Sequence, residues 1–254
     1  MICSLVLGRK GSVGFPGKNL FPVLGRPLAY YPIVAAREAE TVDEVYLSTD
    51  SGELMALAEK EGVNVIKRPV KLCTDQATGL DAFVHGYNVI KELHKDGEIE
   101  FMLLMFCNAP TVIPAAINEG IKVLRANPDY DSAVTVSKYN MWSPLRARRI
   151  EENGLLRPFV PFETFGDPKK MNCNRDSQGD VWFADVALSI VRPRCLENIE
   201  NGLLPQKWMG QKIHPLKQWG GCDVDYEWQV PLVEYWLRKH GFTEDTTPYT
   251  EGSL

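Results

Sequence analysis

The stretch that decides the fold is ICSLVLGRKGSVGFPGKN, residues 2–19. Residues 2–7 form a short apolar run typical of a buried strand, and a loop with four glycines follows directly. Glycines let backbone N–H groups turn toward a ligand without a Cβ in the way, and a run of such groups binds anions. Arg9, Lys10 and Lys18 add positive charge to the loop. The stretch therefore predicts a polyphosphate-binding loop at the end of the first strand.

Other interpretations of this loop are weighed by its spacing. A Walker A motif has four residues between its first glycine and Gly-Lys-Ser/Thr, whereas five lie between Gly11 and Gly17, and Asn19 stands where the hydroxyl belongs. The spacing G-x-G-x-x-G of dinucleotide-binding proteins is also absent. A plain Gly/Pro-rich surface loop with incidental lysines stays open as an alternative.

Composition excludes several classes of protein. The chain has 254 residues, 44% of them hydrophobic, and a formal charge of −5 at pH 7, so we expect a soluble globular protein without a general affinity for nucleic acid or anionic membranes. No apolar run approaches the roughly 20 residues that cross a bilayer. Six cysteines without a C-x-x-C pair argue against a zinc site or a disulfide framework. The N-terminal residues do not resemble a leader, so a cytoplasmic location is expected.

Apolar runs of strand length alternate with helical periodicity through the first half of the chain. This alternation is typical of βα units and predicts an α/β fold with a mostly parallel sheet flanked by helices. The seven consecutive apolar residues 101–107 suit a central strand. The expected strands are 2–7, 44–48, 63–66, 101–107, 132–136 and 181–191, and the expected helices are 28–40, 53–60, 78–95, 115–126 and 227–240.

A single domain is expected over residues 1–254, with one inserted arm. Residues 139–178 hold several prolines and adjacent basic residues without a sustained period, which predicts an excursion from the sheet. Arg146, Arg148 and Arg149 form a basic cluster in this segment. The cluster is either a solvated face or part of an arm that serves dimerisation and the acceptor site of a partner subunit.

Several motifs stand out along the chain, namely residues 8–19, Gly25-Arg26-Pro27-Leu28, Val45-Tyr46-Leu47-Ser48-Thr49-Asp50, Arg68-Pro69, Thr74-Asp75 and Asp223-Val224-Asp225. Together they resemble the acylneuraminate cytidylyltransferase family, whose members make CMP-sialic acid and related CMP-nonulosonates, with KDO cytidylyltransferases as distant relatives. The resemblance implies a nucleotide-diphospho-sugar transferase fold of the GT-A-like, Rossmann-like kind, CTP as substrate, Mg²⁺ as cofactor and a homodimer.

The resemblance also implies roles for single residues. Arg9 and Lys18 would bind the triphosphate and Asp223 and Asp225 would hold Mg²⁺, and these four form the expected catalytic set. Val13 stands where the family has Lys, and Lys10 is a candidate for supplying that charge. The expected nucleotide-binding residues are Gly8, Arg9, Lys10, Gly11, Ser12, Lys18, Asn19, Arg68, Thr74 and Thr78.

The spacing of Asp223 and Asp225 indicates a metal site independently. Residues two apart in an extended segment point to the same side, and Mg²⁺ prefers oxygen ligands such as carboxylates. The alternative is that Asp225 caps the helix expected from residue 227. Many glycosyltransferases of related fold also carry Asp-x-Asp, so the pair alone does not distinguish sugar transfer from nucleotidyl transfer.

The acceptor side departs from the family pattern. The family commonly has Gln-Pro-Thr-Ser-Pro followed by Arg after the central strand, whereas this chain has FCNAPTV at 106–112. Asn108, Arg175 and Gln178 are the candidates for acceptor binding, because Arg175 lies near the family's Arg-Pro-Asn-Gly position and guanidinium groups pair bidentately with carboxylates.

The expected function is transfer of CMP from CTP to the hydroxyl of a 2-keto sugar acid of the sialic, legionaminic, pseudaminic or KDO type, with release of pyrophosphate. The missing Gln and Arg motivate one alternative, a cytidylyltransferase for another anionic acceptor such as a phosphonate. Val13 motivates the other, a nucleotide-binding regulator without turnover. The expected partners are CTP, an anionic small molecule and a second copy of the chain.

Overall fold

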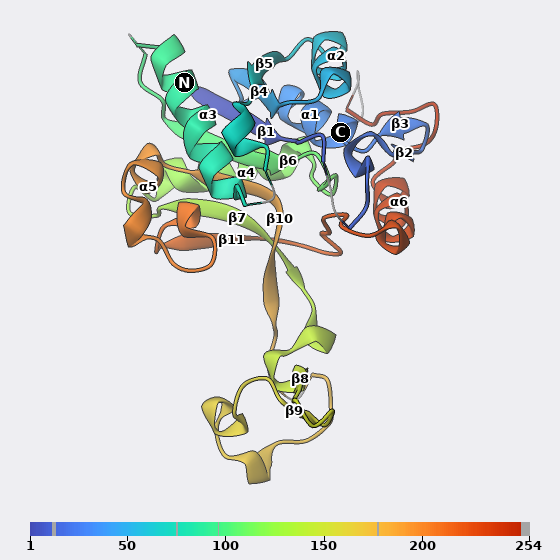
Figure 1. Cartoon of the computed structure of the whole chain (residues 1–254). Helices are drawn as coiled ribbons and strands as arrows, with labels where there is room; N and C mark the ends of the chain where they lie inside the picture. Colours follow the sequence, from blue (N-terminus) through green and yellow to red (C-terminus); the bar gives the residue numbers. More distant parts are fainter. Residues whose placement is uncertain (12–13, 75, 96, 177, 250–254) are drawn as a thin grey trace.

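A seven-stranded sheet in the order β11-β7-β10-β6-β1-β4-β5 forms the centre of the protein (Figure 1). All strands run parallel to β1 except β10, which is antiparallel to β6 and β7. The computed structural model describes residues 1–11, 14–74, 76–95, 97–176 and 178–249. The strands are β1 (Ile2–Leu7), β4 (Glu44–Thr49), β5 (Asn64–Lys67), β6 (Phe101–Phe106), β7 (Ser132–Lys138), β10 (Trp182–Val191) and β11 (Ile213–Gln218).

Helices cover both faces of the sheet because neighbouring residues of the central strands point to opposite sides and both sides are apolar. Val6 and Leu103 belong to a core packed with α1, α2 and α4, whereas Leu5 and Leu104 belong to a core packed with α3 and α5. The helices are α1 (Tyr30–Arg37), α2 (Gly52–Lys60), α3 (Gly79–Leu93), α4 (Pro114–Ala126), α5 (Pro193–Glu197) and α6 (Val230–Lys239).

A third apolar cluster holds α6 beside the glycine loop. Trp236 of α6 packs in this cluster with Tyr31 of α1, and both Phe15 of the loop and Val224 belong to it. The short hairpin of β2 (Pro22–Val23) and β3 (Arg26–Pro27) contributes Val23. The end of the chain is therefore brought to the loop that follows the first strand.

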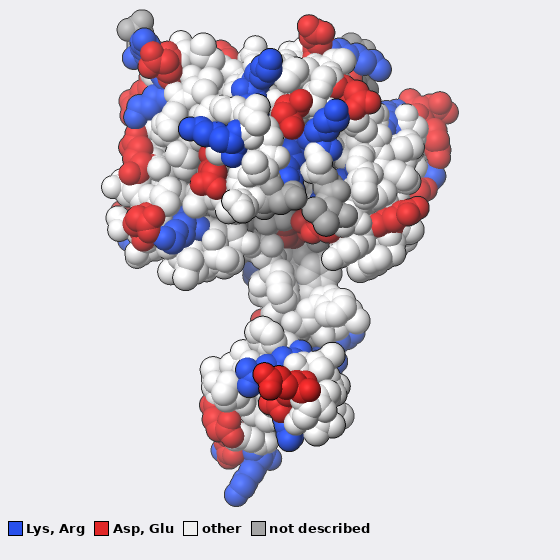
Figure 2. All heavy atoms as spheres, viewed as in Figure 1, with Lys and Arg blue, Asp and Glu red and all other residues white. Residues whose placement is uncertain are grey.

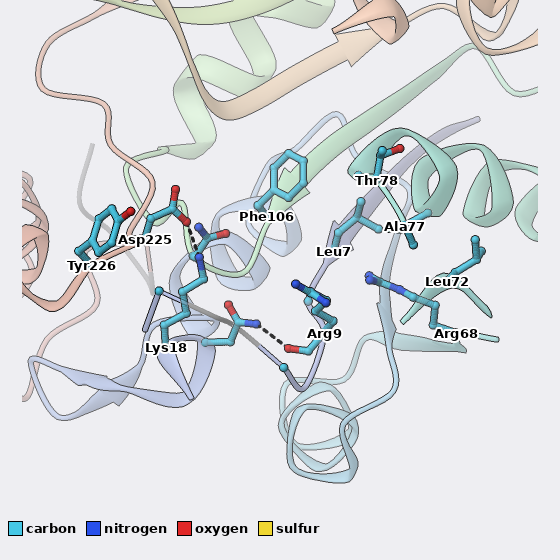
Figure 3. Close-up of a pocket in the computed structure, with 17 residues that line it drawn as sticks. Leu7, Arg9, Lys18, Arg68, Leu72, Ala77, Thr78, Phe106, Asp225 and Tyr226 are labelled. Carbon is cyan, nitrogen blue, oxygen red and sulfur yellow. Dashed lines mark hydrogen bonds and ion pairs between the residues drawn. The ribbon is translucent and has the colours of Figure 1, made fainter. Parts of the chain in front are cut away.

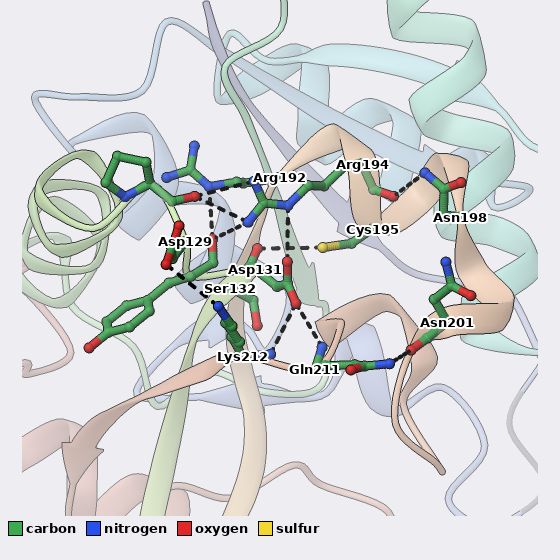
Figure 4. Close-up of polar contacts among 12 residues, drawn as sticks. Asp129, Asp131, Ser132, Arg192, Arg194, Cys195, Asn198, Asn201, Gln211 and Lys212 are labelled. Carbon is green, nitrogen blue, oxygen red and sulfur yellow. Dashed lines mark hydrogen bonds and ion pairs between the residues drawn. The ribbon is translucent and has the colours of Figure 1, made fainter.

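Asp131 forms several hydrogen bonds at the end of the sheet where β11 begins (Figure 4). Its Oδ1 accepts a hydrogen bond from Nε of Arg194 at 3.0 Å, and its Oδ2 accepts from the backbone N–H groups of Gln211 at 2.9 Å and Lys212 at 3.0 Å. Gly210 has φ +73°, and a Cβ there would lie 2.5 Å from the Asp131 Cβ. This carboxylate thus ties β7, β11 and α5 together.

The chain leaves the sheet after β7 and returns at β10, and the intervening residues project from the body as an arm (Figure 1). Lys138 pairs with Trp182 at the base of the arm. Figure 2 shows basic and acidic side chains on the arm and interspersed over the visible face of the body. The arm contains the hairpin of β8 (Arg148–Ile150) and β9 (Leu156–Pro158) and exposes several large apolar side chains, namely Met141, Trp142, Ile150, Leu155, Leu156 and Phe159.

The predicted α/β fold with a mostly parallel sheet is confirmed. The short helix α5 and the hairpins β2–β3 and β8–β9 were not predicted, and further elements also differ from expectation. Strand β11 was not predicted, because it contains His, Pro, Lys and Gln and pairs only as an edge strand beside β7. Helix α6 begins at Val230 rather than Glu227, because residues 227–229 form a 3₁₀ turn. In the described parts of the chain, no helix has the length and apolar character required to cross a bilayer.

Candidate active site

A cavity of about 370 Å³ opens where β1 and β6 end, within the usual size range of small-molecule sites (Figure 3). Leu7 and Gly8 at the end of β1 line it, as does Phe106 at the end of β6. Arg68 and Thr78 lie at one side of the cavity in Figure 3, Asp225 and Tyr226 lie at the other, and Arg9 and Lys18 lie between them.

The glycine loop supplies the middle of the cavity. The cavity is lined by Arg9, Gly11, Lys18 and Asn19. The Asn19 side-chain amide donates a hydrogen bond to the Arg9 backbone carbonyl at 3.1 Å, which connects the two ends of the loop. Lys18 begins a 3₁₀ turn (Lys18–Leu20) after Gly17, whose φ of +74° is disfavoured for other residues. Both Arg9 and Lys18, the predicted phosphate-binding cations, thus line one cavity.

Other predicted loop residues have different surroundings. Gly8 approaches the core, because a Cβ there would lie 2.4 Å from the Cys107 Sγ. The Lys10 backbone N–H donates to Asp50 Oδ1 at 2.8 Å, and Lys10 lines a smaller cavity of about 200 Å³ that shares Arg9, Lys18 and Asn19 with the first. Ser12 and Val13 lie outside the described residues.

Arg68 places a buried positive charge at one side of the cavity. Its side chain is only 7% exposed and donates from Nη2 to the Ser48 carbonyl at 2.7 Å and from Nε to Ser48 Oγ at 3.2 Å. No carboxylate of the described residues forms an ion pair with it, and burial lowers the pKa of its guanidinium. A buried guanidinium without an anionic partner favours an electron-rich ligand group at this side of the cavity.

The N-terminus of α3 reaches the cavity beside Arg68. Thr78 caps this helix, because its Oγ1 accepts from the Asp81 backbone N–H while the Asp81 carboxylate accepts from Thr78. Thr78, Gly79 and Ala82 line the cavity, so the positive end of the helix dipole lies close to it. Thr74 is exposed and does not line the cavity, and Asp75 lies outside the described residues.

Asp225 faces the glycine loop. Its Oδ1 lies 2.5 Å from Nζ of Lys18, and its side chain is 55% exposed. The backbone N–H groups of Asp225 and Tyr226 donate to Gln229 Oε1, both at 2.8 Å. The Asp225 carboxylate is thus directed to the loop, and the cap that precedes α6 is provided by Gln229 instead.

Asp223 precedes Asp225 by two positions, with the buried residue Val224 between them. Burial raises the pKa of Asp223, and the carboxylate of Asp225 adds to the rise. Asp223 does not itself line the cavity, and within the described ranges no group of three or more His, Cys, Asp or Glu residues is arranged to hold a metal. Two carboxylates two positions apart in the chain offer hard oxygen donors of the kind that Mg²⁺ prefers, and substrate phosphate and water would complete such a ligand set.

The three predicted acceptor-binding residues are separated. Asn108 lines the cavity. Its side-chain Nδ2 donates to the Val224 backbone carbonyl at 3.1 Å, and its backbone carbonyl accepts from the Val224 N–H at 2.8 Å. Arg175 and Gln178 lie in the arm, and neither lines the cavity. Arg175 forms an ion pair with Asp176 at 2.9 Å. Within one chain only Asn108 reaches the site, and it holds the Asp223–Asp225 segment in place.

Tyr226 is a cavity residue that the sequence prediction lacks. Its ring is exposed beside Asp225 and lies near the glycine loop, because a Cβ on Gly14 would lie 3.4 Å from the ring. Adjacency to the Asp-x-Asp pair was the one available signal. Phe106, Leu72 and Ala77 also line the cavity, and their apolar side chains carried no signal of binding.

Comparisons with known proteins show the family to which the chain belongs. Residues 3–152, more than half of the chain, match the model of the cytidylyltransferase family. The N-acylneuraminate cytidylyltransferase of Escherichia coli O18:K1:H7 is 26% identical over 178 residues, which cover 69% of this chain and 39% of that protein. N-acylneuraminate cytidylyltransferase A of Danio rerio is 27% identical over 254 residues, covering 95% of this chain and 52% of that protein. The chain therefore spans about half the length, or less, of these relatives.

Solved structures show the same fold. A CMP:2-keto-3-deoxy-manno-octonic acid synthetase complexed with CTP superimposes with a TM-score of 0.64 at 15% identity, covering 94% of this chain and 99% of that one. The 4-diphosphocytidyl-2C-methyl-D-erythritol synthase of Anaerococcus prevotii superimposes with a TM-score of 0.60 at 12% identity, covering 93% of this chain and 96% of that one. The predicted resemblance is confirmed, and the chain belongs to the cytidylyltransferase family.

Proposed function

We propose that this protein transfers CMP from CTP to the hydroxyl of a 2-keto sugar acid and releases pyrophosphate. The observation that carries the proposal is a single cavity in which the cationic glycine loop, the buried Arg68 and the carboxylate of Asp225 meet. Membership of the cytidylyltransferase family and the similarity to N-acylneuraminate cytidylyltransferases support both the nucleotide and the acceptor class.

The cavity suggests how CTP is held. Arg68 and the N-terminus of α3 would take the polar edge of the nucleoside, because a buried guanidinium donates to carbonyl oxygens and the helix end favours negative charge. Arg9 and Lys18 would hold the triphosphate, with Gly11 and Gly14 of the glycine loop beside them. The nucleotide would then cross the cavity from Arg68 toward Asp225.

The reaction is an in-line displacement at phosphorus. The acceptor oxygen forms a bond to the α-phosphorus, the bond from that phosphorus to the bridging oxygen breaks, and pyrophosphate leaves as the hydroxyl proton is lost. Lys18 and Arg9 would stabilise the negative charge on the leaving group. Asp223 and Asp225 would hold Mg²⁺, which supplies further neutralisation of phosphate charge when bound. No histidine lines the cavity within the described residues, so the geometry indicates no histidine base.

A second subunit is part of the proposal. Arg146, Arg148 and Gln178 line a separate cavity of about 700 Å³ in the arm, away from the nucleotide cavity of the same chain. The exposed apolar side chains of the arm favour burial against a partner. We therefore expect a homodimer in which arm cations such as Arg175 reach the acceptor carboxylate bound to the partner. This assembly and the cytoplasmic location remain predictions.

The test is pyrophosphate release from CTP, ATP, GTP and UTP, each offered with sialic, legionaminic, pseudaminic and KDO-type acids. We expect release only with CTP and with at least one of these acids. Release with a phosphonate alone would support a cytidylyltransferase with another anionic acceptor, as FCNAPTV at 106–112 suggests. Tight CTP binding without product from any acceptor would contradict the proposal and favour a nucleotide-binding regulator.

A further inference from the structure

A buried carboxylate outside the cavity lies at an irregular point of β10. Asp185 is 6% exposed, and no basic residue of the described chain forms an ion pair with it. The register between β10 and β7 shifts between Ala184 and Ser189, and Val186 has φ +52°. A β-branched residue is strained in this left-handed region and persists there only where the surroundings enforce it.

Hydrogen bonds from four donors hold the Asp185 carboxylate. Its Oδ1 accepts from Thr135 Oγ1 at 2.6 Å and from the Ala187 N–H at 3.3 Å. Its Oδ2 accepts from Ser137 Oγ at 2.7 Å and from Gln218 Nε2 at 2.9 Å. Each oxygen therefore has two donors, which compensates the burial of the group without a cation.

The same contacts continue into the segment that carries Asp223 and Asp225. Ser137 Oγ, which donates to Asp185, accepts from the Gly221 N–H at 2.8 Å. A Cβ on Gly221 would lie 2.1 Å from the Asp185 Oδ2, so the segment passes directly against the carboxylate. Because a hydroxyl has one proton, its donation to Asp185 turns a lone pair of Ser137 toward Gly221.

Two further anchors follow along this segment. Gln218 Nε2 also donates to the Thr111 carbonyl at 3.1 Å, and the Cys222 N–H donates to Thr111 Oγ1 at 3.0 Å. Val224 then pairs with the backbone and side chain of Asn108. Asp185 contacts β7 through Ser137, contacts β11 through Gln218, and lies against Gly221 in the approach to Asp223.

We infer that Asp185 is a positioning residue: through Ser137 and Gln218 it determines where Asp223 and Asp225 lie relative to the glycine loop. The inference rests on the proposed function, because its consequence is expressed at the expected metal pair. It assigns Asp185 no contact with substrate. An amide in its place would direct an N–H group at Ser137 or Gln218 and would disturb the orientation of the Ser137 hydroxyl.

The test measures Mn²⁺ binding by electron paramagnetic resonance in the presence of CTP, with thermal melting measured in parallel. We expect Asp185→Asn and Ser137→Ala to weaken Mn²⁺ binding about tenfold or more, as loss of a supporting shell does at metal sites. Asp131→Asn is the matched control, because Asp131 is also tied to β7 and β11 by several hydrogen bonds but lies at the opposite end of both strands. It should lower the melting temperature and leave Mn²⁺ binding unchanged.

The outcomes separate this inference from the proposed function. Wild-type protein that binds neither CTP nor Mn²⁺ would contradict the proposed function. If the wild type binds Mn²⁺ and the variants Asp185→Asn, Ser137→Ala and Asp131→Asn bind it equally strongly, the role of Asp185 is overturned. The proposed function is not affected by that result. If Asp185→Asn does not fold, Ser137→Ala decides, because it removes the hydroxyl link to Gly221 while Asp185 keeps its other donors.

Discussion

The ammonium nitrogen of Lys18 lies 2.5 Å from Oδ1 of Asp225, although the two residues are 207 positions apart in the chain. The Lys18 side chain is largely buried, whereas that of Asp225 is half exposed. In the proposed reaction a triphosphate would compete with Asp225 for Lys18, and Mg²⁺ would compete with Lys18 for Asp225. The ion pair therefore keeps both charges at the cavity and neutralises them before the substrate binds.

Lys18→Met is expected to lower kcat/KM for CTP about 100- to 1,000-fold, because it removes a charge that faces the leaving group. The melting temperature should change little, since the apolar stem is kept. Lys122→Met on the exposed side of α4 is the matched control and should resemble the wild type. Wild-type kcat/KM in Lys18→Met would remove the glycine loop from the mechanism.

Asp225→Asn is expected to raise the Mg²⁺ concentration for half-maximal activity about tenfold or more, because an amide keeps the shape of the side chain but loses the charge that attracts the cation. A metal titration of the turnover rate measures this. Glu227→Gln removes an exposed carboxylate two residues further on and should leave the titration unchanged. The same Mg²⁺ response in Asp225→Asn and wild type would exclude Asp225 as a ligand.

Asp81→Ala is expected to lower the free energy of unfolding by about 0.5–1 kcal/mol at pH 7, because it removes one half of the capping box at the start of α3. Hydrogen bonds from Thr78 hold the pKa of Asp81 below its usual range. A lowered folded-state pKa means that the stabilisation is complete above the unfolded-state pKa of about 4 and is lost as the pH falls through the folded-state value.

Urea unfolding of wild type and Asp81→Ala between pH 7 and pH 3 checks this. The difference in free energy of unfolding between the wild type and Asp81→Ala should become smaller below about pH 4. Glu119→Ala, which removes an exposed carboxylate from α4, is the control and should show a small gap throughout. A constant gap for Asp81→Ala would contradict the titration of the capping box.

Gly8→Ala is expected to destabilise the protein by about 1–3 kcal/mol through overpacking. Its Cβ would lie 2.4 Å from the Cys107 Sγ and 3.0 Å from the Leu54 Cδ1. Adding Cys107→Ala should restore part of the loss, so the double-mutant cycle in urea unfolding should show a favourable coupling. Gly52→Ala meets nothing within 4 Å and serves as the control. Additive effects of Gly8→Ala and Cys107→Ala would show that the clash is relieved elsewhere.

The central elements could be predicted because their signals are local. Strands β1 and β6 are buried almost entirely on both faces, and this property appears in the chain as short runs that are apolar except for Ser4. Strand β11 pairs only with β7 and includes Pro215, so its identity depends on a neighbour far away in sequence. The 3₁₀ turn before α6 was also missed, although local hydrogen bonds stabilise it: the backbone N–H groups of Asp225 and Tyr226 donate to Gln229 Oε1.

The predicted site residues also fall into two groups: those that line the cavity and those that the fold places elsewhere. The family resemblance pointed to Arg9, Lys18 and Asp225, and all three line one cavity. It also pointed to Arg175 and Thr74, which the fold places elsewhere, because a position in a motif does not determine whether an arm or an exposed loop carries the residue.

By itself, the order of residues determined the alternation of strands and helices, the cationic glycine loop and the presence of a carboxylate pair near the end of the chain. Only the tertiary structure decided that Asp225 of this pair meets the loop at Lys18, and that Asp185, Ser137 and Gly221 hold the segment in place. The physical reason is range: burial and periodicity are recorded in neighbouring residues, whereas ion pairs and hydrogen bonds between distant segments exist only after the sheet has brought them together.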